Sequence, residues 1–351
     1  MFKNLSGDEQ GSAEANEADK YMAGAEAAFA EKELEGSLID VQEFDKDWYD
    51  LGSPDYHVTD EGLAYSISAL IQAFDPYNVG QISQTKFYKL LYILSANLKE
   101  TGVDIKLPYF WYRHGPVVPY SFLPDGIIEL RPMNWSKHQG KWVVLRKRLF
   151  PKVVAVKKET IDDAVASLRE KYNGAKTAKI VSDVYVTAPH NFQRDYKEFI
   201  KHIDNKIKYR DIICSVQDLR VREDINRLEK AVNLFDESQF PQIYDDLLQW
   251  KTIAKYCINE LATIDPIFAS RLSHVYWDNL FCMFLKVKNF QNLPERLIAK
   301  WQRDLPTTQD KYERHFQGIE SQFYSSIYHP AASLNKDICN AYCECLRSLF
   351  K

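Results

Sequence analysis

The sequence contains none of the short motifs that mark the commonest nucleotide-binding and hydrolytic sites. It has no G-x-x-x-x-G-K-[ST] phosphate loop, no G-x-G-x-x-G after a predicted strand, no H-E-x-x-H and no nucleophile elbow. These absences disfavour the familiar nucleotide-dependent enzymes, zinc peptidases and serine hydrolases. We therefore expect a non-enzymatic protein with no catalytic residues, no metal and no cofactor.

Long apolar runs are also missing. The most apolar long stretch, residues 277–287, is interrupted by Asp278 and Lys286 and is too short to span a bilayer. The N-terminus is acidic and polar, whereas a signal peptide begins with a basic segment followed by an apolar one. The six cysteines stand in a chain long enough to build a core without disulfides, so we expect reduced thiols. A cytoplasmic protein without membrane association is the resulting prediction.

Two other groups of polar residues suggest chemistry but are better explained as structure. Cys339, Cys343 and Cys345 form no C-x-x-C pair, so we favour buried thiols over a zinc site. The paired carboxylates Asp245 and Asp246 have no partner ligands at a defined spacing, which favours a solvated helix face.

The charge of the chain is divided unequally along its length. Residues 1–50 hold 14 acidic and 4 basic residues, a net charge of −10, and subtraction leaves 41 basic and 35 acidic residues elsewhere, a net charge of +6. We predict that residues 1–55 form an acidic, disordered arm. Two interpretations of this arm stay open: a solvated tail, or a segment that folds on a partner or covers the protein's own basic surface.

The segment after residue 75 resembles a calcium-binding loop in its spacing but not in its chemistry. Tyr77 and Val79 stand where such a loop needs oxygen ligands, and Lys86 replaces the bidentate glutamate. We predict a turn that binds no calcium.

Residues 83–122 are the most informative stretch. Phe87, Leu90, Leu91, Leu94 and Leu98 recur at helical spacing, with Ser83 as a predicted N-cap. A loop rich in aromatic residues follows and ends in the rigid sequence GPVVP. Proline fixes φ, glycine permits positive φ, and aromatic rings bury large areas, so this loop should be well packed.

This stretch resembles the SocA-like, or Panacea, domain of prokaryotic antitoxins. The resemblance rests on the helix residues and the Y-x-x-G-P-V segment, namely Lys86, Tyr88, Lys89, Leu90, Leu91, Tyr92, Trp111, Tyr112, His114, Gly115, Pro116 and Val117. The chain departs from the family at Phe87-Tyr88, where a leucine-glutamine pair is common. A looser second match comprises Glu170, Lys171, Tyr172, Tyr185, Ala188, Pro189 and Phe192. Together the matches cover about residues 60–200.

The resemblance implies a protein-interaction module that binds a cognate protein, either a toxin or a subunit of a toxin–antitoxin, phage-defence or mobile-element system. The partner-binding candidates are Lys89, Tyr92, Trp111, Tyr112, His114, Gly115 and Pro116. For these aromatic residues two interpretations stay open, because exposed Tyr and Trp anchor interfaces while the same residues also form cores.

Residues 141–158 support an alternative function. They contain seven basic residues and no acidic one, and Val143-Val144 and Val153-Val154 predict two short strands of a hairpin. Lysines that protect a sheet edge explain this charge most simply. The alternative is a nucleic-acid-binding surface formed by Arg146, Lys147, Arg148, Lys152, Lys157 and Lys158.

The predicted fold is mainly α with a small β element. We expect a SocA/Panacea-like domain at residues 56–205 with a small β-hairpin, followed by an all-helical domain at residues 206–351. Successive apolar stripes predict the helices of the second domain. One helix is expected to begin near Asn292, and a separate, later helix is expected to include Tyr312.

Overall fold

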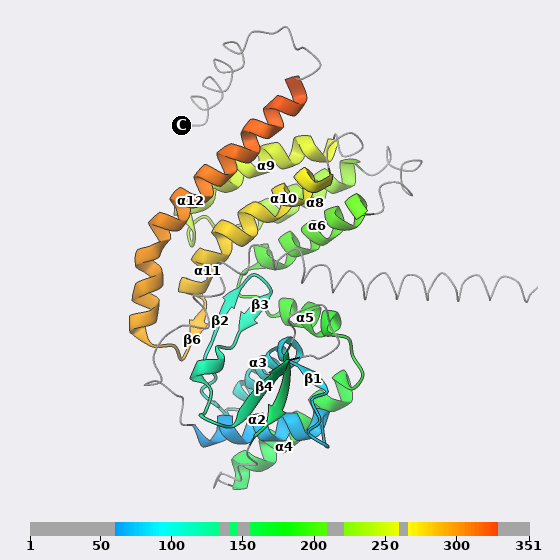
Figure 1. Cartoon of the computed structure of the whole chain (residues 1–351), viewed down its shortest axis with the longest axis vertical. Helices are drawn as coiled ribbons and strands as arrows, with labels where there is room; N and C mark the ends of the chain where they lie inside the picture. The colour runs from blue at the N-terminus through cyan, green and yellow to red at the C-terminus, as the bar shows by residue number, and fades with distance from the viewer. Residues whose placement is uncertain (1–59, 133–140, 147–154, 209–220, 260–265, 329–351) are drawn as a thin grey trace, which may run out of the picture. The chain divides into compact units, whose positions relative to one another are not determined.

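The computed structural model describes residues 60–132, 141–146, 155–208, 221–259 and 266–328. They form two compact units, each built from two stretches of the chain. Unit 1 runs to Thr187 and includes Asn289–Ala299, whereas unit 2 comprises Ala188–Lys288 and continues from Lys300. Helices predominate, and two small antiparallel sheets accompany them (Figure 1), which confirms the predicted fold class.

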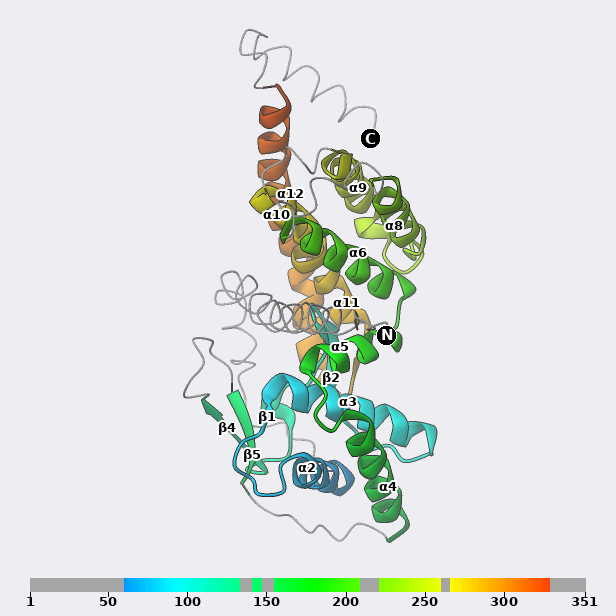
Figure 2. The ribbon, with the colours of Figure 1, turned by 90° about the vertical axis from the view of Figure 1, so that its right-hand side faces the viewer.

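Four helices form most of unit 1: α2 (Glu61–Phe74), α3 (Gln84–Glu100), α4 (Ala155–Tyr172) and α5 (Thr177–Val186). The Asp60 carboxylate caps α2 by accepting from the backbone N–H of Leu63, and Ser83 caps α3 as predicted. α4 packs against both α2 and α3, and α2 and α4 lie side by side in Figure 2. The buried face of α3 is the apolar stripe that the sequence indicated.

The first sheet of unit 1 has the strand order β1–β5–β4. It consists of β1 (Ile82–Ser83), β5 (Lys141–Leu145) and β4 (Ile128–Pro132), all antiparallel. β5 confirms the predicted strand at Val143-Val144. Its hairpin partner is β4, however, and β1 pairs with its other edge, so no side of β5 is left for the predicted pairing with residues 153–154. Those two valines lie outside the described residues.

The second sheet of unit 1 joins segments that are far apart in sequence. β2 (Tyr109–Tyr112) pairs with β3 (Gly115–Val117) on one edge and with β6 (Phe290–Gln291) on the other, all antiparallel. The Asn292 amide also donates to the carbonyl of Leu107 at 3.0 Å. Residues 289–299 are therefore part of unit 1. A short 3-10 turn (Tyr120–Phe122) follows β3.

Unit 2 is helical apart from its connections. Its elements are α6 (Asn191–Lys208), α8 (Val221–Asn233), a 3-10 turn (Pro241–Ile243), α9 (Tyr244–Asn259), α10 (Pro266–Tyr276), a π-helical turn (Trp277–Phe281), α11 (Cys282–Lys288) and α12 from Lys300 onward. α6 packs against α8 and α10, and α9 also packs against these two helices. The sequence-based boundary near residue 205 falls within α6.

Aromatic rings dominate the core of unit 2. Tyr196 stacks on Trp277 with ring centroids 5.3 Å apart, and both residues are fully buried. The polar atoms of such rings need partners. Trp250 Nε1 donates to the carbonyl of Leu272 at 2.7 Å, and the Tyr276 hydroxyl donates to the carbonyl of Ile243 at 3.2 Å.

Two expectations for the helices are wrong. α12 runs unbroken from Glu295 to Tyr328, so the two helices predicted after Asn292 are one. Pro306 lies inside it, on an exposed position where the carbonyl that loses its partner can bind water.

The second wrong expectation concerns Asp246, which is not solvated but 91% buried. Burial raises the pKa of its carboxyl to about 6, and the charge of Glu313 adds to that effect.

Candidate interaction site

The structure buries most of the predicted partner-binding residues of unit 1. Lys89 and Tyr92 lie on the buried face of α3, and the residues on β2 and β3 are buried as well, namely Trp111, Tyr112, Gly115 and Pro116. His114, in the turn between β2 and β3, is exposed. The structure therefore brings these residues together around one core, with a single member at the surface.

The buried amine of Lys89 fastens α3 to β3. Its Nζ donates to the carbonyl of Pro116 at 2.9 Å. Burial lowers the pKa of Lys89 to about 7. Gly115 makes room for the amine, since a Cβ at this position would lie 3.4 Å from Lys89 Nζ and from Val184 Cγ1. The φ of Gly115 is +90°, which also favours glycine.

The aromatic residues of the motif connect α3, β2 and α5. Trp111 lies edge-on to Tyr92 and to Tyr185, with both centroid distances at 5.9 Å. The Tyr185 hydroxyl donates to the carbonyl of Arg113 at 2.9 Å. Tyr185 belongs to the second, looser match in the sequence, so the two matched segments pack on each other. Of the two interpretations left open for Trp111, the structure places this ring in a core.

The basic segment is described only in part. Arg146 is exposed at the end of β5, and Lys157 and Lys158 are exposed in the first turns of α4. Lys158 Nζ lies 4.0 Å from Asp162 Oδ2 in the same helix. Three further candidates, Lys147, Arg148 and Lys152, lie outside the described residues.

The loop between α2 and α3 is held rigidly. The buried Asp75 carboxylate accepts from three backbone N–H groups, those of Val79 (3.1 Å), Gly80 (2.8 Å) and Gln81 (3.1 Å). These three hydrogen bonds hold the loop as the turn that the sequence predicted. Gly80 has a φ of +84° and lies against the Cβ of Trp142, where a Cβ of its own would approach to 3.2 Å.

Asn78 attaches this loop to β5. Its Nδ2 donates to the carbonyl of Leu145 at 2.8 Å, and its Oδ1 accepts from the Leu145 N–H at 2.7 Å. The amide side chain thus takes the place of a neighbouring strand for one residue. The φ of Asn78 is 53°, a left-handed conformation that asparagine tolerates better than most residues.

The rigid loop presents two apolar side chains to solvent. Tyr77 is 82% exposed and Val79 is 64% exposed. The prediction of a simple turn did not include these two exposed side chains. The signal was there, because these two residues stand where the spacing of a calcium loop calls for oxygen ligands.

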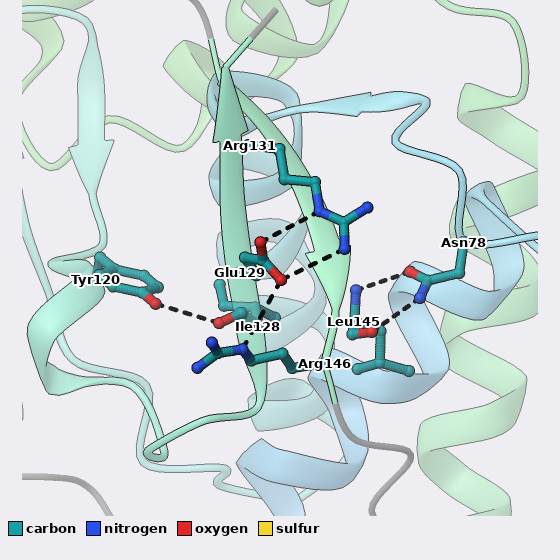
Figure 3. A network of polar contacts seen from close by, with 7 residues as sticks. All are labelled: Asn78, Tyr120, Ile128, Glu129, Arg131, Leu145 and Arg146. Atoms are coloured by element: carbon teal, nitrogen blue, oxygen red, sulfur yellow. Dashed lines mark hydrogen bonds and ion pairs between the residues drawn. The ribbon is translucent and has the colours of Figure 1, made fainter.

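Two arginines lie beside this loop on the first sheet. Arg131 Nε and Arg146 Nε lie 3.3 Å and 3.8 Å from the two carboxylate oxygens of Glu129 (Figure 3). The hydrogen bond from Arg131, followed by the charges of both arginines, lowers the pKa of Glu129. Arg146 directly follows Leu145, whose backbone Asn78 holds. The loop and the arginines therefore belong to one surface.

Unit 2 contains an ionic cluster around His274, whose side chain is 32% exposed. The Nε2 atom faces Asp204 Oδ2 at 3.0 Å, and Nδ1 faces Asp278 Oδ2 at 3.5 Å. Burial lowers the pKa of His274, but the hydrogen bonds to the two carboxylates outweigh it and raise the pKa to about 9. Because both nitrogens face carboxylates, the ring is held as an imidazolium and is unsuited to act as a base. No pattern in the sequence indicates that His274 contacts Asp204, which lies 70 positions earlier.

No group of three or more His, Cys, Asp or Glu side chains in the described part of the chain could hold a metal ion. Cys257 and Cys282 are buried thiols, and burial raises the pKa of Cys257 to about 12. The proposed cluster of Cys339, Cys343 and Cys345 lies outside the described residues.

No protein-family model, curated protein or solved structure matches this chain. Among the helices that the structure describes, none is long and apolar enough to cross a membrane.

Proposed function

We propose that this protein is a non-enzymatic, cytoplasmic protein-interaction module of the antitoxin-like type. It acts by direct binding to a cognate protein, a toxin or a subunit of a phage-defence or mobile-element system. The observation that supports this proposal is the contact network of unit 1. Lys89, Trp111, Pro116 and Tyr185, all from the segments that resemble the SocA-like domain, meet in one core.

In this proposal the buried motif residues are the scaffold, and partner binding falls to the exposed residues around it. A polar contact such as Lys89 with Pro116 fixes how α3 meets β3, because a buried amine must keep an acceptor. Exposed residues such as His114 are then presented on a rigid body, which lowers the entropic cost of binding.

The test is co-expression of the tagged full-length protein with the products of its neighbouring genes, followed by size-exclusion chromatography. We expect one neighbour to co-elute in a fixed stoichiometry and, if that neighbour is toxic alone, growth to be restored by co-expression. A protein that elutes alone and restores growth against none of its neighbours contradicts the proposal.

A competing proposal is nucleic-acid binding through residues 141–158. The exposure of Arg146, Lys157 and Lys158 favours it. Binding of a labelled 20-nucleotide duplex should then weaken steeply with salt, and should weaken further when Arg146, Lys147 and Arg148 are replaced by glutamine. Duplex binding that these substitutions leave unchanged would exclude this segment as the site.

A further inference from the structure

One surface of unit 1 combines two exposed apolar side chains with two exposed arginines. Tyr77 and Val79 come from the loop between α2 and α3, and Arg131 and Arg146 from β4 and the end of β5. We call these four residues the loop patch. Arg131 and Arg146 side chains are 55% and 64% exposed. Exposed ion pairs with Glu129 contribute little, so the guanidinium groups retain donors for another carboxylate.

The loop patch is built before anything binds to it. Asp75 and Asn78 fix the loop backbone through five hydrogen bonds, three to the Asp75 carboxylate and two to the Asn78 amide. A ligand therefore does not have to order the loop, which lowers the entropic cost of docking. Nothing in the fold itself requires an exposed tyrosine and valine here, and rigid exposed aromatic residues are typical of interface anchors.

The chemistry of the loop patch fits an acidic peptide segment better than a nucleic acid. Glu129 lies between the two arginines (Figure 3) and offsets one of their two positive charges, whereas nucleic-acid binding depends on many uncompensated basic groups. Val79 has no role in phosphate binding. An acidic segment that also carries aromatic or aliphatic residues can pair its carboxylates with the guanidinium groups and cover Tyr77 and Val79.

The chain itself contains a segment of this kind. Residues 40–50 read DVQEFDKDWYD, with five carboxylates and one lysine, a net charge of −4. Phe44, Trp48 and Tyr49 supply aromatic rings within the same eleven residues. We propose that residues 40–50 dock on the loop patch of the same molecule, with their carboxylates on Arg131 and Arg146.

The length of the connection permits this docking. Residues 51–59 link the segment to Asp60 at the start of α2, and nine extended residues span up to about 30 Å. The loop patch begins at the other end of α2, which has 14 residues and is therefore about 21 Å long. The connection can reach past the full length of the helix.

The test is photo-crosslinking in the full-length protein. Phe44 is replaced by p-benzoylphenylalanine, the sample is irradiated, and crosslinked peptides are mapped by mass spectrometry. We expect crosslinks within one molecule to residues 75–81 or to β4. The same reagent at Phe29, outside the segment, is the control position and should give no enrichment there.

Charge reversal tests the role of the arginines. The double variant Arg131→Glu/Arg146→Glu should lower the crosslink yield about tenfold, since two attractions become repulsions. Further substitution of Asp45→Lys and Asp47→Lys should restore it. The matched control Lys157→Glu/Arg169→Glu changes the same amount of charge on α4 and should leave the yield unchanged.

Three outcomes overturn the proposal. Crosslinks from position 44 to other parts of the chain, or none, show that the segment does not dock on the loop patch. Crosslinks that appear only in a covalent dimer show that a second copy supplies the segment. An equal loss of yield in the Lys157→Glu/Arg169→Glu control shows general charge attraction. None of these results affects co-elution with a neighbouring gene product, so the proposed function is tested separately.

Discussion

The amine of Lys89 lies 2.9 Å from the carbonyl oxygen of Pro116, in the interior of unit 1. Burial of a lysine with a single carbonyl acceptor is costly, because the charged form loses its hydration. The contact nevertheless ties a helix to the GPV strand at a position where Gly115 leaves room for the amine. It therefore fixes the position of α3 against β3. It also makes the stability of the protein depend on pH.

Replacement of Lys89 by methionine should remove this pH response. The pKa of Lys89 is about 7 in the folded protein, against 10.5 when unfolded, so the unfolded chain binds more protons between these values and stability rises with pH. The gain reaches up to about 4 kcal/mol by pH 10.5. Urea unfolding at pH 6.5, 8 and 9.5 should show this rise in the wild type and a flatter profile in the variant. Equal slopes would contradict the proposed burial of the amine.

Gly80→Ala should destabilise the protein more than Gly102→Ala. Both glycines have positive φ, +84° and +82°, so an alanine is strained at either position. At Gly80 the added methyl would also lie 3.2 Å from the Cβ of Trp142, whereas Gly102 has nothing within 4 Å. We expect a cost of about 1 kcal/mol at Gly102 and about 2–3 kcal/mol at Gly80. Thermal unfolding of both variants checks this, and equal shifts in Tm would show that the loop yields to the methyl.

His274→Gln should abolish a loss of stability at alkaline pH. The folded pKa of about 9 exceeds the unfolded value of 6.5, so the stabilisation is fully present below pH 6.5 and is lost as pH rises through 9. Its size is at most about 3 kcal/mol, because the partly exposed side chain is screened by solvent. Unfolding measured from pH 6 to 10 should decline less in the variant than in the wild type. His315→Gln on the exposed face of α12 is the control, and a matching change there would remove the role of Asp204 and Asp278.

Substitution of the buried Trp111 should destabilise the protein much more than substitution of the exposed Tyr77. Trp111→Leu should cost about 3 kcal/mol of stability, because it removes a buried ring that contacts Tyr92 and Tyr185. Tyr77→Ser should change stability by no more than about 0.5 kcal/mol, since the ring is exposed. Differential scanning calorimetry of the two variants decides the matter. A small effect at Trp111 would reopen a direct role in binding.

Local patterns were enough to predict much of the fold. Apolar spacing and the Ser83 cap located α3, because these signals lie within a few residues of each other. The pairing of β5 was not predictable, since Ile82 lies opposite Val143 across 61 positions of sequence. Pro306 could not be used to predict where a helix ends, because an exposed proline can be tolerated within a helix.

The candidate site was predicted only in part. The motif residues Lys89, Trp111 and Pro116 do lie together, but the sequence could not tell burial from exposure for aromatic residues beside proline and glycine. The loop patch depends on Asn78 contacting Leu145, a contact between distant segments that has no local signature. The same holds for His274, whose carboxylate partner on α6 is 70 residues away.

The pairing of β2 with β6 has a consequence for biosynthesis. Residues 60–187 are synthesised well before Phe290, because the first stretch of unit 2, Ala188–Lys288, lies between them in the sequence. At typical rates of translation this interval is on the order of ten seconds. During this interval β2 can pair with β3 on one edge, but its other edge has no partner strand. The N–H of Trp111 then lacks its acceptor, the carbonyl of Asn289, which has not yet been synthesised. The nascent chain is most prone to pair with another polypeptide during that interval, before its own late strand closes the sheet.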